Sequence, residues 1–416
     1  MNYGLPVEKM KNMNFGGGIR EILAQADEME RAGRSVLHLE IGRPDFDSPE
    51  SAKKAAIRAL ESGDVHYTDM SGTPEIRGEI AAKFKRDAGM DVDADREVVV
   101  TAGAVEAIAT TMMTLLNPGD EVIVPSPYFP VYDDVIKMAG GVLRPVPCKI
   151  ENGFRPAPEN IEQAITPRTR IIMINSPNNP TGATSTRSEL EAIADLAKSN
   201  GLLVVSDECY EKFAYDESTP HISIASVPGM KERTFTLSAA SKTFSMTGWR
   251  VGWLVIPAET KPFIMKCHQG LTTCANSFAQ AGVAEALRSA WPDVERMITE
   301  YKARRDLMVD ALQDRGYKRT DAQGSFLRLS RDQRLGYSLY RILLETTLGD
   351  RRIDGPGTAI RSGGRLHEAD ILSAQERDKR SSHTNGRFRR EAETLIASCF
   401  NRILYMDKNH REVRVS

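Results

Sequence analysis

The sequence predicts an α/β protein, with a mostly parallel central sheet covered by helices and a smaller α+β domain. Between residues 50 and 260, short apolar, β-branched runs alternate with longer helical patterns, which is typical of parallel strands joined by crossover helices. Several of the runs are apolar throughout, as strands buried on both faces are. The length of 416 residues corresponds to roughly two or three domains.

Six apolar runs predict the strands of the central sheet, and helices are expected between them, for example over residues 105–116 and 188–199. The six runs are residues 97–101, 121–125, 170–175, 202–206, 234–237 and 251–256.

The smaller domain is expected to combine the N-terminal segment with the C-terminal third. A helix is predicted over residues 17–33 and a strand over residues 36–41. Residues 275–316 predict one long helix or two, with Gly316 as the stop.

Composition excludes several classes of protein. Lys and Arg total 55 and Asp and Glu 57, giving a net charge of −2, so no large basic field is present to hold nucleic acid. The longest apolar runs, residues 171–174 and 202–205, are far shorter than the roughly 18 residues of a membrane span. Residues 1–18 lack the continuous apolar segment of a secretory signal. Five cysteines without a CxxC pair favour reduced thiols and a cytoplasmic location, and no metal-site spacing is present.

Ligands of open α/β sheets bind beyond the carboxyl ends of the strands, so residues that follow the apolar runs are candidates for a site. One such segment carries Lys242 among small hydroxyl residues, with Arg250 shortly after it. A lysine that is desolvated and close to another cation has a lowered pKa and can form a Schiff base. Small neighbours admit a phosphate group, which an arginine can clamp with two hydrogen bonds.

Three further segments follow other apolar runs. Asp207 can hold a cationic ring nitrogen, and Tyr210 can offer its hydroxyl to the same ligand. Residues 175–182 form a rigid turn, rich in proline, that fixes an asparagine amide. Residues 101–107 form a small-residue turn into a helix, whose free N–H groups can bind phosphate. The four segments together predict a site for a phosphorylated aromatic aldehyde.

These segments, in this order and with these separations, resemble the class I/II aminotransferases of pyridoxal-phosphate fold type I. The resemblance runs from about Val36 to Phe326. It implies that pyridoxal 5'-phosphate is the cofactor and that an amino group moves from an L-amino acid to a 2-oxo acid through a Schiff base on Lys242. It also implies a homodimer with shared active sites.

The resemblance implies a role for each matching residue. Lys242 corresponds to the Schiff-base lysine that also moves the α-proton, and Asp207 to the partner of the pyridine nitrogen. Tyr210 and Asn179 correspond to the pair that hydrogen-bonds the phenolic oxygen of the ring, and Tyr128 to the aromatic side chain that stacks on it.

The remaining expected contacts concern the phosphate group and the substrate. The expected phosphate ligands within the chain are Gly103, Ala104, Val105, Ser241 and Arg250. Tyr67 corresponds to a tyrosine that reaches the phosphate of the neighbouring subunit. Gly42 corresponds to a glycine beside the substrate carboxylate, where Asn179 is also expected. The family usually has Ser or Gly where this chain has Ala239. A phosphate-binding hydroxyl is lost there unless Ser238 or Ser241 substitutes for it, so weaker cofactor binding is the most that is expected.

The resemblance also divides the chain. Residues 1–45 are expected to belong to the small domain, residues 46–275 to the large cofactor-binding domain, and residues 276–326 to a helical link and the start of the small domain. Residues 327–416 are atypical: they hold 18 of the 55 basic residues, of which 16 are Arg, and 12 of the 57 acidic residues.

The family's carboxylate-binding arginine, which anchors the amino-acid substrate, has no recognisable counterpart after Phe326. We therefore hypothesise that the C-terminal region, residues 327–416, is translated in a shifted reading frame that starts near Phe326. The alternative is a divergent small domain with another anchor. Two rival functions stay open: a β-lyase on the same fold, which would release pyruvate and ammonia without an oxo-acid acceptor, and a catalytically impaired protein that only binds pyridoxal phosphate.

Overall fold

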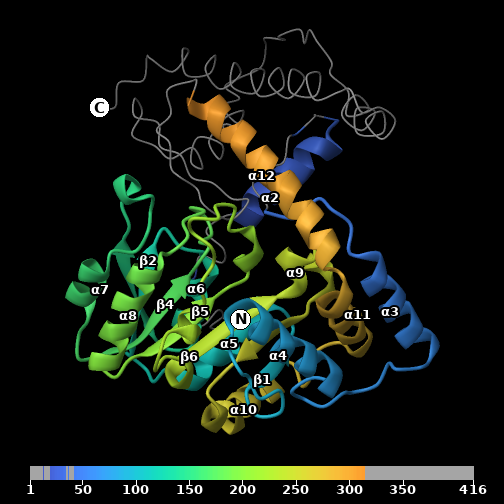
Figure 1. The fold of residues 1–416 in the computed structure, drawn as a ribbon, viewed down its shortest axis with the longest axis horizontal. Helices are drawn as coiled ribbons and strands as arrows, with labels where there is room; N and C mark the ends of the chain where they lie inside the picture. Colours follow the sequence, from blue (N-terminus) through green and yellow to red (C-terminus); the bar gives the residue numbers. More distant parts are fainter. Residues whose placement is uncertain (1–12, 14–18, 34–35, 37–41, 314–416) are drawn as a thin grey trace, which may run out of the picture.

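A seven-stranded mixed sheet forms the centre of the protein (Figure 1). The structure is a computed structural model that describes residues 13, 19–33, 36 and 42–313. The strands are β1 (Val98–Thr101), β2 (Glu121–Ser126), β3 (Val142–Pro147), β4 (Thr169–Asn175), β5 (Leu203–Asp207), β6 (Thr234–Ala239) and β7 (Gly252–Val255). Their order is β1-β7-β6-β5-β4-β2-β3. Only β7 runs against its neighbours β1 and β6, whereas the other pairs are parallel.

Helices cover both faces of this sheet. They are α2 (Ile19–Arg31), α3 (Glu50–Glu61), α4 (Pro74–Ala88), α5 (Ala104–Leu115), α6 (Val131–Met138), α7 (Pro158–Ala164), α8 (Arg187–Ser199), α9 (Ala240–Thr243), α10 (Lys261–Leu271), α11 (Ser277–Ser289) and α12 (Trp291–Gln313). Short 3₁₀ turns are η2 (Ile150–Asn152), η3 (Glu211–Phe213), η4 (Ile224–Ser226), η5 (Lys231–Arg233), η6 (Thr247–Trp249) and η7 (Ala258–Thr260). No helix in the described ranges is long and apolar enough to cross a membrane.

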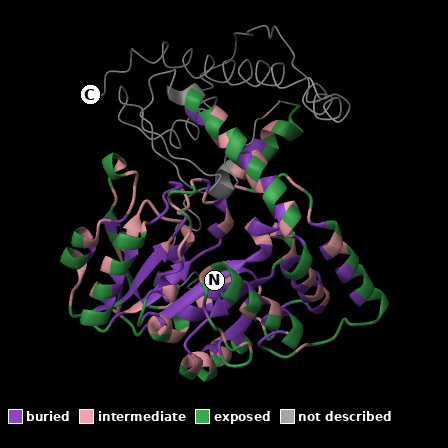
Figure 2. Ribbon diagram, in the orientation of Figure 1, coloured by how far each residue is buried: buried purple, intermediate pink, exposed green. Residues whose placement is uncertain are grey.

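Apart from the edge strand β3, the strands are buried on both faces, as the continuous apolar runs predict (Figure 2). In β4, Ile171 and Met173 pack with α5 and α6, whereas Ile172 and Ile174 pack with α8 on the other face. Successive side chains of a strand point to opposite faces, so a strand inside a three-layer structure needs apolar residues at every position. The predicted α/β class is confirmed.

The predicted strands lie within two residues of the observed ones, and one strand is missing from the prediction. β3 is an edge strand that pairs only with β2, and it contains Pro145 and Pro147. Proline is tolerated at a sheet edge, where its missing N–H faces no partner strand, but it obscures the strand pattern. The strand predicted over residues 36–41 and the stop at Gly316 lie outside the described residues.

Residues 275–316 contain two helices, α11 and α12, rather than one. Ala290 ends α11, and Pro292 stands in the first turn of α12, where its missing N–H costs nothing. Asp45 accepts hydrogen bonds from Arg304 and Tyr301 of α12, at 2.8 and 2.9 Å. The segment that leads into α3 is thereby tied to α12.

A buried carboxylate holds the amino-terminal ends of β2 and β4 together. Glu121, the first residue of β2, is 1% exposed. Its Oε1 accepts hydrogen bonds from Arg144 (3.0 Å) and Arg168 (2.9 Å), and its Oε2 accepts one from Thr166 (2.6 Å). The hydrogen bond from Arg144, together with the other donors, lowers the pKa of Glu121 from its usual 4.5 to about 2.

Replacing Glu121 with glutamine is expected to lower the free energy of unfolding at pH 7 by about 1–2 kcal/mol. The pKa of Glu121 is lower in the folded than in the unfolded protein, so its contribution is fully present above pH 4.5. It is lost as the pH falls from there towards 2. Urea unfolding of both proteins at pH 7 and pH 3 measures this. Glu217→Gln, at an exposed position, is the control. A stability difference that is larger at pH 3 than at pH 7 would contradict the assignment.

Candidate active site

The expected site residues gather at one edge of the sheet because six of the seven strands run in the same direction. Gly103 follows β1, Asn179 follows β4, Asp207 ends β5 and Lys242 follows β6. Arg250 precedes β7, and the reversed direction of β7 brings it to the same edge. This edge is where open α/β sheets bind their ligands.

Lys242 lies in the short helix α9, half-buried beneath the segment that begins at Gly42. Its Nζ donates a hydrogen bond to the carbonyl oxygen of Gly42, at 2.6 Å. The Nζ also lies 5.8 Å from the centre of the Tyr210 ring. Burial lowers the pKa of the Lys242 ammonium group, and the positive charge of Arg250 adds to this effect. A lysine in this state deprotonates more readily, as a nucleophile or proton carrier must.

Asp207 is a buried carboxylate at the end of β5, 5% exposed. Its Oδ2 accepts a hydrogen bond from the hydroxyl of Tyr132 (2.6 Å), and its Oδ1 accepts one from the backbone N–H of Cys209 (3.1 Å). Burial raises the pKa of Asp207, and these hydrogen bonds oppose that rise. A buried carboxylate of this kind favours a cationic partner, such as a protonated ring nitrogen.

Asn179 and Tyr210, which follow β4 and β5 respectively, contact each other. The Asn179 Nδ2 donates to the Tyr210 hydroxyl at 3.4 Å. The backbone N–H of Asn179 donates to the Oδ1 of Asn175, at 2.7 Å, and Asn175 is the register partner of Asp207. Burial raises the pKa of Tyr210, so its hydroxyl stays protonated and can donate a hydrogen bond.

Gly103 and Arg250 form a cradle at the N-terminus of α5. Arg250 donates to the carbonyl oxygens of Thr247 (3.1 Å) and Ala102 (3.4 Å), and within the described part of the chain it forms no ion pair. A Cβ atom on Gly103 would lie 2.5 Å from the Arg250 Nη2, and Gly103 also has a positive φ of 84°, so only glycine fits. The helix N-terminus and this guanidinium both favour an anion.

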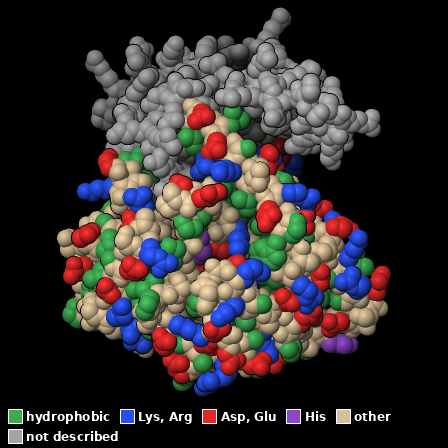
Figure 3. Space-filling model, viewed as in Figure 1, with side chains coloured by type: hydrophobic (Ala, Val, Ile, Leu, Met, Phe, Trp, Pro, Cys, Tyr) green, Lys and Arg blue, Asp and Glu red, His purple; other side chains and the backbone are tan. Residues whose placement is uncertain are grey.

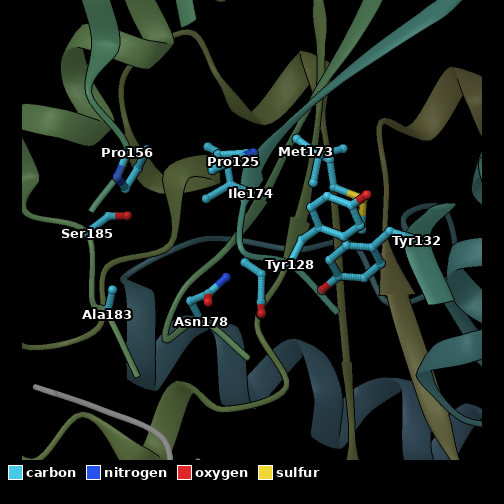
Figure 4. A pocket seen from close by; sticks show the side chains of 11 residues that line it. Pro125, Tyr128, Tyr132, Pro156, Met173, Ile174, Asn178, Ala183 and Ser185 are labelled. Atoms are coloured by element: carbon cyan, nitrogen blue, oxygen red, sulfur yellow. The ribbon is translucent and has the colours of Figure 1, made fainter. Parts of the chain in front are cut away.

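Three expected site residues are less closely joined to this group. Ser241 is half-buried on α9 beside Lys242. Tyr67 is 88% exposed, so its side chain is available to a second molecule. Tyr128 lines a cavity of about 350 Å³, a volume that includes the solvent at its mouth, at the carboxyl ends of β2 and β4 (Figure 4).

Tyr132 is a site residue that the sequence analysis missed. It lies in the first turn of α6, is 1% exposed, and lines the same cavity as Tyr128 (Figure 4). It lies 75 positions from Asp207 in the sequence, so only the packing of α6 against the sheet brings the two together. A tyrosine shortly after a strand end was the available signal.

Replacing Tyr132 with phenylalanine is expected to reduce kcat about tenfold, the effect of losing one hydrogen bond to a charged group. Without the hydroxyl, the pKa of Asp207 rises further, so the acid side of the pH–rate profile moves to higher pH. Steady-state kinetics between pH 5 and 9 measure this. Tyr215→Phe is the matched control, because the Tyr215 hydroxyl is buried without a hydrogen-bond partner in the described ranges. An unchanged profile for the Tyr132 variant would contradict the expectation.

A half-buried lysine, a buried carboxylate and an anion cradle at one edge of an open α/β sheet form the kind of site that a group-transfer enzyme needs. The chain belongs to the family described as aminotransferase class I and II, whose family model matches residues 34–352. It is an aminotransferase. The match includes the first part of the tail, beyond Phe326.

Known relatives support the same assignment. The chain is 39% identical over 322 residues to aromatic-amino-acid aminotransferase 2 of Thermococcus litoralis, covering 77% of this chain and 82% of that protein. It is 40% identical over 306 residues to the aspartate/prephenate aminotransferase of Thermus thermophilus, covering 73% and 78%. The solved aspartate aminotransferase from Thermus thermophilus with maleate has a TM-score of 0.74 and 38% identity, covering 77% and 83%. The fold type I architecture is therefore confirmed.

Proposed function

We propose that this aminotransferase uses pyridoxal 5'-phosphate and that Lys242 is the residue that binds its aldehyde group. The observation that carries the proposal is the convergence of Lys242, Asp207 and the Gly103–Arg250 cradle at one sheet edge. The donor set fits the cofactor: the cradle suits its phosphate, and the buried carboxylate suits its ring nitrogen. Because Gly103 has no side chain, the Arg250 guanidinium can lie directly against the start of α5. When bound, the cofactor withdraws electrons from the substrate Cα and so makes the α-proton acidic.

Each residue then has a defined task. Asp207 keeps the ring nitrogen protonated, and the hydrogen bond from Tyr132 favours the ionised form of Asp207. Asn179 and Tyr210, joined at 3.4 Å, bind the phenolic oxygen. Lys242 Nζ, with its lowered pKa, takes the proton from the substrate Cα and returns it during transfer.

The remaining contacts follow from the positions of single residues. Tyr128 is proposed to stack on the ring, and Gly42 to lie beside the substrate carboxylate. Ala104, Val105 and Ser241 are proposed to complete the phosphate site. The amino donor is proposed to be an aromatic or dicarboxylic amino acid and the acceptor 2-oxoglutarate, in keeping with relatives named for aromatic amino acids and aspartate.

The decisive experiment is a spectral titration of the purified protein. Uptake of pyridoxal phosphate is expected to produce Schiff-base absorbance, and a preferred amino acid is expected to bleach it. Addition of a 2-oxo acid should restore it. A protein that takes up no pyridoxal phosphate would refute the proposal, whereas release of pyruvate and ammonia without an acceptor would indicate a β-lyase.

We also propose a homodimer with shared active sites. Large apolar side chains are exposed on the 65–70 segment, α5 and α10, namely Val65, Tyr67, Met70, Val105, Met113, Phe263 and Leu271. These three parts adjoin, because His268 of α10 contacts both the Met70 carbonyl and Glu106 of α5. Exposed apolar patches of this kind mark interfaces. Sedimentation should give about twice the chain mass of 46.1 kDa, and a monomer would refute the proposal.

The proposed domain division is a large domain over residues 46–275, to which residues 276–326 add a helical link and the start of the small domain. Residues 1–45 contribute to the small domain, and residues 327–416 form the atypical C-terminal region. The contact of Asp45 with Arg304 supports the grouping of these two segments. The residues from 314 onwards lie outside the described part, so the missing arginine and the shifted frame stay hypotheses. If no single-base change near codon 326 of the coding DNA restores a small-domain sequence, the frame-shift idea fails.

The absent arginine also favours a second candidate function, a protein that binds pyridoxal phosphate but transaminates poorly. Schiff-base absorbance that no amino acid changes would support this candidate.

A cytoplasmic location is proposed as well. Cys148, Cys209, Cys267 and Cys274 are free thiols in the described ranges, as a reducing compartment would keep them.

On the face shown in Figure 3, acidic and basic side chains are interspersed over the described residues, without an area of a single sign. This agrees with the net charge of −2. Small charged substrates, rather than nucleic acid, are therefore the proposed partners.

A further inference from the structure

A completely buried histidine lies behind the phosphate cradle. His268 of α10 is 0% exposed. Its Nδ1 lies 3.0 Å from the Oε1 of Glu106, and its Nε2 lies 2.8 Å from the carbonyl oxygen of Met70. A carbonyl oxygen only accepts hydrogen bonds, so the Nε2 carries a proton and donates it. Both ring nitrogens are thus engaged, and the ring joins α5 to the 65–70 segment.

Glu106 receives more than this one contact. It lies in the first turn of α5, where a carboxylate also interacts favourably with the helix dipole. Its Oε1 accepts a hydrogen bond from the Thr110 hydroxyl at 2.5 Å. Its Oε2 accepts one from the backbone N–H of Ala102 at 3.0 Å. With three partners, the Glu106 side chain has a single well-defined position.

Ala102 is the point where this network meets the cradle. Its N–H is held by Glu106, and its carbonyl oxygen accepts the hydrogen bond from Arg250 Nη2 at 3.4 Å. Gly103 follows directly and leaves no space between its Cα and the Arg250 guanidinium. A shift of Ala102 would therefore move both the start of α5 and Arg250.

A helix cap alone would need only the contact between Glu106 and Ala102. The structure adds a buried imidazole that ties the same carboxylate to a separate segment of the chain. We propose that Glu106 and His268 form a positioning pair, which holds the Ala102–Gly103 turn and Arg250 in place for the phosphate group of the cofactor. The inference rests on the proposed binding of pyridoxal phosphate at this site.

The test compares two aldehydes, pyridoxal phosphate and pyridoxal, which lacks the phosphate group. Both are titrated against the apo forms of wild type, Glu106→Gln and His268→Gln, and binding is followed by Schiff-base absorbance. Each substitution is expected to raise the dissociation constant of pyridoxal phosphate about tenfold, the effect of one lost hydrogen bond to a carboxylate. The dissociation constant of pyridoxal is expected to stay at the wild-type value, because Lys242 and Asp207 are untouched.

The control is Glu121→Gln, which removes another buried carboxylate, at the opposite edge of the sheet. It is expected to lower stability while both dissociation constants stay unchanged. Equal losses for the two aldehydes in the Glu106 and His268 variants, or no loss for either, would overturn the inference. If these two variants fail to fold, Thr110→Val removes a single donor to Glu106 and gives the same comparison. A wild-type protein that binds neither aldehyde would instead refute the proposed function itself.

Discussion

Replacing Lys242 with alanine is expected to abolish Schiff-base absorbance and to reduce transamination by about three to four orders of magnitude, since a positioned proton carrier contributes up to ~10⁴-fold. Among the lysines of the described residues, Lys242 is the one placed under the Gly42 carbonyl and beside the Tyr210 ring, so no other lysine there can substitute for it. Absorbance spectra with pyridoxal phosphate and single-turnover kinetics with an amino acid measure the two effects.

Lys266→Ala removes an exposed lysine of α10 and is the control for the loss of a positive charge. It should keep both the absorbance and the rate of the wild type. Transamination by Lys242→Ala at a rate within tenfold of wild type would show that another residue carries the proton, and the assignment of Lys242 would then be wrong.

Replacing Asp207 with asparagine is expected to reduce kcat by about 10²–10³-fold, the usual effect of removing an electrostatic partner from an active site. Asparagine keeps the shape of the side chain but removes the negative charge that favours a protonated ring nitrogen. Its amide also presents an N–H group where Asp207 accepts hydrogen bonds from Tyr132 and Cys209. The measurements are kcat and the dissociation constant of pyridoxal phosphate.

The neighbouring carboxylate provides the matched control. Glu208 is as buried as Asp207, but its oxygens accept hydrogen bonds from Ser206 and Ser223 and contact His221. Glu208→Gln is expected to lower stability with little effect on kcat. Equal losses of kcat in the two variants would mean that Asp207 acts through the fold rather than on the cofactor.

Much of the sheet can be predicted from the sequence because its strands are buried on both faces. A strand such as β4 has a continuous apolar run at its centre, and this pattern can be read directly from the amino-acid sequence. The edge strand β3 does not show this pattern, because only Val146 is buried there. A strand that is mostly exposed does not need continuous apolar residues, so the sequence does not reveal it. The split between α11 and α12 depends on Pro292, which can stand either at a helix start or inside a kinked helix.

Some of the site residues could likewise be predicted from the sequence, whereas others could not. Lys242, Asp207 and Asn179 follow predicted strands. They can be predicted as site residues because ligands of open α/β sheets bind beyond the carboxyl ends of the strands. Arg250 precedes a strand, and its place at the same edge depends on the reversed direction of β7. Tyr132 and His268 lie within helical segments, and their partners lie 75 and 162 positions away, so only the packing of the chain reveals their roles.

The sequence by itself determined the α/β class, the order of the strands along the chain and the segments that carry chemistry. Each of these follows from local patterns: buried strands need continuous apolar residues, and turns at strand ends need small or polar ones. The tertiary structure alone decided which buried groups support the site. Tyr132 on Asp207, and His268 with Glu106 on Ala102, are hydrogen bonds between distant segments. These bonds form because packing removes both partners from water, where a buried polar group without a hydrogen-bond partner would cost free energy.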